Sequence, residues 1–149
     1  MHEKRAYGKH SVYIEGDTVY SIPHGEITLP EVHIFNDIVA EVIAKHGYCL
    51  YLGDIKDAAG IEASARRYSA QWSIGKPVLG IAMFNAGLIA STVFTLLLKA
   101  ANMIRRQALP FAFFRTEQEA RSWLAQLREQ HLAKLKQGPP PPVHDSASA

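Results

Sequence analysis

The chain has 149 residues, of which 48% are hydrophobic and 20% charged, the length and composition of one globular domain. Its formal net charge is only +2, and this near balance argues against the strongly basic surface that nucleic-acid-binding proteins present. The one cysteine, Cys49, excludes a disulfide framework and a cysteine-based zinc site within one chain. We expect its thiol to be buried and inert.

The N-terminal half begins with a predicted β-hairpin. Segments 10–15 and 18–27 are rich in Val, Ile, Tyr and Thr, and Gly16-Asp17 lies between them. The first ten residues of the chain are basic and are followed by no apolar core, which is not the pattern of a secretory signal. A cytoplasmic location is therefore expected.

A long amphipathic helix is predicted after the hairpin. Thr28 and Glu31 have the spacing of a capping box, which satisfies backbone donors at a helix start. Apolar residues follow at helical spacing as far as His46, and Gly47 then provides a left-handed end.

A strand over residues 48–53, a polar loop over 54–60 and a second helix are predicted next. Ile61, Ala65, Tyr68 and Trp72 share one face of this helix. Gly75 and Pro77 should stop it.

The segment 77–98 carries no charged residue, a length that raises the question of a membrane-spanning helix. Pro77, Gly80 and the turn Asn85-Ala86-Gly87 interrupt it, however. We therefore predict a buried strand, Val78–Phe84, followed by a helix, Leu88–Ile104.

This third helix is apolar on more than one side. The predicted core-facing residues are Leu88, Ile89, Val93, Leu96, Leu97, Ala100 and Ile104. Phe94 and Leu98 should then extend the apolar surface towards the other side, which a surface helix usually keeps polar. A neighbouring helix, a second subunit in a possible homodimer, an apolar ligand or a bilayer surface could cover them.

A last strand, Pro110–Phe114, precedes a helix opened by a second capping box at Thr116 and Glu119. From residue 137 the composition changes to Pro, Ser and Ala. We expect a folded domain over 1–136 and a disordered tail over 137–149. The predicted order ββαβαβαβα implies an α/β domain whose mixed sheet has an opening hairpin, parallel strands and packed helices.

Polar loops should converge at the carboxyl ends of the parallel strands, where open α/β sheets bind ligands. Such loops precede helix starts, which attract anions, although their residues could equally serve only as helix caps. Ser64, near the start of the second helix and followed by Arg66-Arg67, is a candidate for phosphorylation, or an ordinary surface serine. The candidate residues for a partner or a small apolar or anionic ligand are Asp54, Lys56, Asp57, Gly60, Ser64, Asn85, Gly87 and Arg115.

No nucleophile elbow, phosphate-binding loop, dinucleotide fingerprint or zinc-protease motif occurs in the sequence. The seven histidines show no metal-ligand spacing on one element. We therefore predict no catalysis, no metal and no cofactor. A small enzyme using Asp54 or His24 is the least supported alternative.

Three stretches resemble one known group: residues 25–28 (GEIT), 51–54 (YLGD) and 113–124 (FFRTEQEARSWL). With the order of elements, they make the chain similar to the STAS-like family that includes the anti-sigma-factor antagonists, and most of all to its STAS/CRAL-TRIO-like bacterial branch. The resemblance implies a cytosolic signalling or ligand-sensing module without catalysis. Antagonist relatives carry a phosphorylated serine after the third strand. Here that stretch reads GIEASA (60–65), with alanine at the usual acceptor position and Ser64 beside it.

Two functions follow as expectations. The first is binding of a protein partner or small ligand at the loop edge and the third helix. The alternative is a protein that binds an apolar, lipid-like ligand or a membrane surface through Phe94, Leu98 and Arg105-Arg106.

Overall fold

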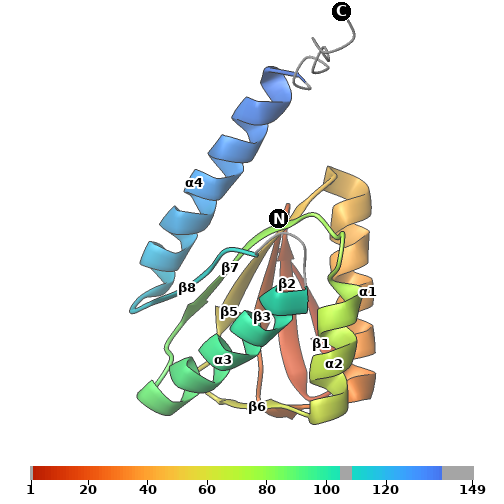
Figure 1. The fold of residues 1–149 in the computed structure, drawn as a ribbon, viewed down its shortest axis with the longest axis vertical. Helices are drawn as coiled ribbons and strands as arrows, with labels where there is room; N and C mark the ends of the chain where they lie inside the picture. The colour runs from red at the N-terminus through yellow and green to blue at the C-terminus, as the bar shows by residue number, and fades with distance from the viewer. Residues whose placement is uncertain (1, 105–108, 139–149) are drawn as a thin grey trace, which may run out of the picture.

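A computed structural model describes residues 2–104 and 109–138 of the chain (Figure 1). It contains a six-stranded sheet in the order β1-β2-β3-β5-β7-β8 and a two-stranded sheet, β4-β6. The strands are β1 (His2–Tyr7), β2 (His10–Glu15), β3 (Thr18–Ile22), β4 (Gly25–Ile27), β5 (Cys49–Asp54), β6 (Ala58–Ile61), β7 (Val78–Phe84) and β8 (Phe111–Phe114). The helices are α1 (Leu29–His46), α2 (Ala63–Trp72), α3 (Leu88–Ile104) and α4 (Glu117–Lys136).

The main sheet is mixed, as predicted. Strands β1, β2 and β3 pair antiparallel, whereas β3, β5, β7 and β8 pair parallel. The opening hairpin is β2–β3, with Glu15 opposite Thr18 across the predicted turn. The predicted α/β class with packed helices is confirmed.

Helices cover both faces of this sheet (Figure 1). Along β5 the side chains alternate, as the pleat requires. Cys49 belongs to the core beneath α1 and α2, while Leu50 and Leu52 pack with Ala120 and Leu124 of α4. One face thus carries α1, α2 and α3, and the opposite face carries α4.

The capping box predicted at α1 is present, and of the one predicted at α4 the threonine half is formed. At the start of α1, the Glu31 carboxylate accepts hydrogen bonds from the Thr28 backbone N–H (2.9 Å) and hydroxyl (3.0 Å). Gly47 ends this helix with φ 83°, and its N–H donates to the Ile43 carbonyl. At the start of α4, Thr116 Oγ1 accepts a hydrogen bond from the Glu119 N–H.

The uncharged middle segment divides where its turn residues predict. It forms strand β7, a turn in which Asn85 adopts φ 61°, and helix α3. Within residues 2–104 and 109–138, each helix is too short or too polar to cross a membrane.

Three short strands escape the sequence-based prediction. Strand β1 lies in the basic N-terminal segment, where it is an outer strand whose charged side chains remain in water. The predicted second strand of the hairpin stops at Ile22, because Pro23 cannot donate to the ladder, and the chain resumes as β4. The predicted polar loop 54–60 contains most of β6, which pairs parallel with β4.

The predicted orientation of α3 is wrong. Leu88, Ile89 and Leu96, expected to face the core, are 85%, 81% and 64% exposed. Phe94, expected to face outward, is buried, and Leu98 packs against the same cluster. Because the helix is apolar on several sides, its sequence pattern does not single out one buried stripe.

Two predicted features lie outside the described residues. These are the cationic pair Arg105-Arg106 and residues 139–149 of the predicted tail. Helix α4 ends at Lys136, where the composition of the sequence changes.

Candidate functional site

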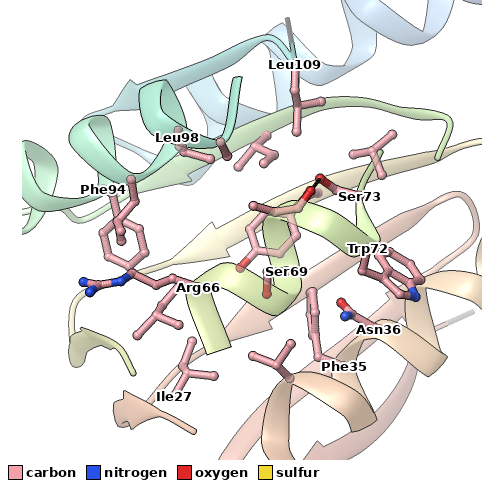
Figure 2. Close-up of a pocket in the computed structure, with 18 of the residues that line it drawn as sticks. Ile27, Phe35, Asn36, Arg66, Ser69, Trp72, Ser73, Phe94, Leu98 and Leu109 are labelled. Atoms are coloured by element: carbon pink, nitrogen blue, oxygen red, sulfur yellow. Dashed lines mark hydrogen bonds between the residues drawn. The ribbon is translucent and has the colours of Figure 1, made fainter. Parts of the chain in front are cut away.

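A cavity of about 610 Å³ lies between the sheet and the three helices on its α1 face (Figure 2). All of these elements contribute to its lining. The larger lining side chains are Phe35 and Val39 of α1, Tyr51 and Met83 of the sheet, Trp72 of α2, and Phe94 and Leu98 of α3. The site is therefore a largely apolar pocket that is partly open to solvent.

Small residues on α2 and α3 explain why this space is not filled. The lining surface of α2 includes Ala63, Ser69 and Ala70, and that of α3 includes Ala100 and Ala101. Such side chains are too short to reach the sheet, whereas larger side chains would fill the gap to the density usual in protein cores.

Contacts between helices hold the wall formed by α2 in place. The rings of His33 on α1 and Tyr68 on α2 lie with their centroids 4.3 Å apart. At the other end, the carboxylate of Glu62, just before α2, accepts a hydrogen bond from the N–H of Leu29 (3.0 Å). The cavity is thus bounded by packed elements.

The ionisable groups deep in the cavity are uncharged near neutral pH. Burial raises the pKa of the Cys49 thiol to about 12. Burial likewise raises the pKa of the Tyr7 phenol, which shares a hydrogen bond with Ser21 Oγ (2.5 Å), and that of the Tyr51 phenol. Among the described residues of the lining, the permanent charges belong to Arg66 and Arg67, whose side chains are exposed.

One polar group in the lining lacks a partner. Asn36 of α1 is only 6% exposed, and its side-chain Nδ2 has no hydrogen-bond partner among the described residues. Buried amides are nearly always hydrogen-bonded in proteins. Because Asn36 also lines the cavity, this donor is the candidate partner for a molecule bound there.

Part of the predicted loop edge does converge. Asp54 Oδ1, at the end of β5, accepts hydrogen bonds from Asn85 Nδ2 (3.1 Å) and from the Lys56 N–H (3.2 Å). Asn85 and Arg115 line a smaller hollow of about 410 Å³ beyond β7 and β8.

The other loop candidates have different surroundings. Asp57 lies 3.8 Å from His24 Nδ1, and its carbonyl accepts a hydrogen bond from the Gly25 N–H. Gly60 belongs to strand β6, Ser64 to the first turn of α2, and the Gly87 carbonyl bonds to Ser91 at the start of α3. No hydrogen bond in the described chain links these three residues to Asp54 or Asn85.

A buried histidine–carboxylate pair lies outside both hollows. His10 Nε2 and Glu31 Oε1 are 3.0 Å apart, and His10 Nδ1 accepts a hydrogen bond from the His24 backbone N–H. Nε2 must therefore carry the proton that is donated to Glu31. This pair connects the first turn of α1 to strand β2. Among the described residues, no three His, Cys, Asp or Glu side chains are placed to bind a metal ion.

Comparisons with known proteins identify the fold. No protein-family model and no curated protein sequence matches the chain. The unphosphorylated anti-sigma factor antagonist SpoIIAA superposes with a TM-score of 0.47 and 12% identity, covering 84% of this chain and 98% of that one. An uncharacterised DUF3478-family protein from Shewanella loihica, described as having a SpoIIAA-like fold, superposes with a TM-score of 0.56 and 17% identity, covering 83% and 95%. The fold is SpoIIAA-like. The superposition on the Shewanella protein thereby confirms, at the level of fold, the resemblance indicated by the sequence.

Sequence reasoning missed the cavity in this SpoIIAA-like fold. Asn36 lies on the same helical stripe as Val32, Phe35 and Val39, so its position among apolar neighbours was a readable signal. The cluster of Ala and Ser residues in α2 was a second signal. The cavity itself depends on how α2 and α3 are placed over the sheet, which no local pattern specifies.

Proposed function

We propose that this protein binds one apolar small molecule in the cavity beneath α1, α2 and α3 and catalyses no reaction on it. The observation that carries the proposal is an apolar pocket of about 610 Å³ between the sheet and these three helices. Ligand pockets in proteins commonly have volumes of about 300–1,000 Å³, with mostly apolar walls and few polar groups.

An occupant would add packing contacts to the side chains that border the pocket. Side chains that border a void lose dispersion contacts, and voids in protein cores reduce stability in proportion to their size. Phe94 and Leu98 are central here, because both are directed into the space rather than towards solvent (Figure 2). In this proposal Phe94 and Leu98 still form a binding surface, but they contact a ligand in the pocket and not an external partner.

The absence of catalysis is supported by the chemistry of the described lining. General acid–base catalysis near neutral pH needs a group that exchanges a proton there. The pKa values of Cys49, Tyr7 and Tyr51 are shifted upward by burial, away from that range. His10 and Glu31 bond to one another outside the cavity.

Binding of a protein partner at the loop edge stays a prediction, as do phosphorylation of Ser64, a homodimer and a cytoplasmic location. Asp54, Asn85 and Arg115 at the carboxyl ends of β5, β7 and β8 support the first of these. The cavity supports ligand binding more directly, because its volume and its apolar lining both suit an apolar small molecule.

Titration with N-phenyl-1-naphthylamine, an apolar dye that fluoresces in apolar surroundings, tests the proposal. We expect saturable binding of one dye per chain. Ala101→Phe places a phenyl group in the cavity and should weaken binding about tenfold or more, whereas Ala44→Phe on the exposed side of α1 should leave it unchanged. Equal dye binding by both variants, or no binding by the natural protein, would contradict the proposal.

A further inference from the structure

We propose that Asn36 selects ligands that carry an uncharged hydrogen-bond acceptor on an apolar body. The inference rests on the proposed function, since it assigns the chemistry of the molecule that would occupy the same cavity. Its basis is the buried, unpartnered Nδ2 of Asn36 in a lining that is otherwise almost wholly apolar.

The direction of the polarity follows from the amide itself. The unpartnered atom is the amide nitrogen, which only donates hydrogen bonds. An occupant that is hydrocarbon throughout would leave this donor unsatisfied, whereas an occupant that carries an acceptor would satisfy it. An oxygen acceptor is therefore the complementary group.

The charge of the acceptor follows from its surroundings. A carboxylate or phosphate taken out of water needs a cation or several donors to offset its desolvation. Within the described lining the cations are Arg66 and Arg67, both exposed. Figure 2 shows Arg66 beside Phe94, whereas Asn36 lies in the part of the view that holds Trp72. A ketone, ester, ether or hydroxyl oxygen suits Asn36 better than an anion.

The remainder of the ligand is defined by the opposite part of the cavity. Phe94 and Leu98 of α3 and Met83 of β7 border it there and offer no polar side-chain group apart from a thioether. The preferred ligand would place its oxygen near Asn36 and extend an aliphatic or aromatic portion towards Phe94.

A matched pair of ligands separates the role of the acceptor from the role of the apolar body. 2-Undecanone and 2-methyl-1-undecene have nearly the same shape, but only the ketone can accept a hydrogen bond. Competition with the bound dye gives the affinity of each. We expect the natural protein to prefer the ketone about fivefold, the size of effect that one net hydrogen bond supplies.

Asn36→Leu removes the donor while keeping the number and branching of side-chain heavy atoms, and it should abolish that preference while retaining alkene binding. Retained alkene binding also shows that the cavity is intact; should the leucine variant not fold, Asn36→Ala serves the same purpose. Equal affinities of both ligands for the natural protein, or a ketone preference that survives either substitution, would overturn the role of Asn36. Dye binding without any discrimination would leave the proposed function standing, whereas failure of all three molecules to bind would remove both.

Discussion

Arg128 of α4 donates two hydrogen bonds to Asp17 in the β2–β3 turn, from Nε to Oδ2 (2.6 Å) and from Nη2 to Oδ1 (2.7 Å). The same carboxylate accepts hydrogen bonds from Tyr48 (2.6 Å) and Thr18 (3.0 Å). Burial alone would raise the pKa of Asp17, but these donors outweigh burial and lower it. The ion pair joins the last helix to the first hairpin across the sheet face opposite the cavity.

Replacement of Arg128 by alanine should destabilise the fold without affecting the cavity. It leaves the buried Asp17 carboxylate with two neutral donors, and because the arginine is partly exposed we expect a loss of about 1–2 kcal/mol. Urea unfolding measures this loss, with exposed Gln130→Ala as the control. Combined with Asp17→Asn, the effects should be clearly non-additive; additive effects would show that the pair contributes little.

The domain should lose stability in acid as the Glu31 carboxylate becomes protonated. Burial raises the pKa of this carboxyl, but hydrogen bonds from Thr28, His10 and Lys9 outweigh it and hold the pKa at about 2, below the ordinary 4.5. A lowered pKa means that the stabilisation is complete above pH 4.5 and is lost as the pH falls towards 2.

Glu31→Gln should therefore reduce stability by roughly 2–3 kcal/mol at pH 7 and by progressively less below pH 4.5. Urea midpoints of both proteins from pH 7 to pH 2.5 measure this convergence. Exposed Glu129→Gln is the control and should track the natural protein throughout. A difference between the Glu31 variant and the natural protein that stays constant with pH would argue against the lowered pKa.

Gly8 should tolerate no side chain. Its φ of 70° is a left-handed conformation, and a Cβ placed there would overlap the Glu31 carboxylate. Gly16, with φ 62° and open space around it, is a matched control for the backbone effect alone.

We expect Gly16→Ala to cost about 1 kcal/mol, from backbone strain. Gly8→Ala should cost at least about 2 kcal/mol, since it also displaces the carboxylate that caps α1. Thermal or urea unfolding compares the two. Equal losses would mean that the Glu31 carboxylate moves aside freely.

The thiol of Cys49 should report on the cavity. It lines the chamber, is buried and has a pKa raised by burial to about 12. Because the thiolate is the reactive form, the folded protein should react with a disulfide reagent at pH 8 far more slowly than the urea-unfolded chain. Addition of 2-undecanone should slow the reaction of the folded protein further; an unchanged rate at saturating ketone would argue against ligand in the cavity.

The features that the sequence predicted correctly are those set by local chemistry. The Thr28–Glu31 capping box, the end of α1 at Gly47 and the division of the uncharged segment all depend on residues close together in the chain. The α3 face could not be read in this way, because Leu88 and Phe94 are equally apolar and only packing decides between them. Strand β6 was missed because its Ala and Gly residues have little strand propensity, and its pairing with β4 comes from tertiary context.

The candidate site shows the same division. Asp54 and Asn85 were predicted to meet because the ends of parallel strands share one edge. The chamber was not predicted, since it is a space left where the short side chains of α2 and α3 stop short of the sheet. Asn36 becomes a candidate ligand contact only because it lines that space.

Two helices that line the pocket, α1 and α2, bury very different numbers of residues. Helix α1 buries six residues, among them Val32, Ile38 and Val42, whereas α2, which is described throughout, buries only Ala65. Regions that bury little apolar surface open at a small fraction of the free energy needed to unfold a whole domain. Hydrogen exchange should accordingly be faster in α2 than in α1, so α2 is the wall of the pocket that opens first while the sheet, α1 and α4 stay folded.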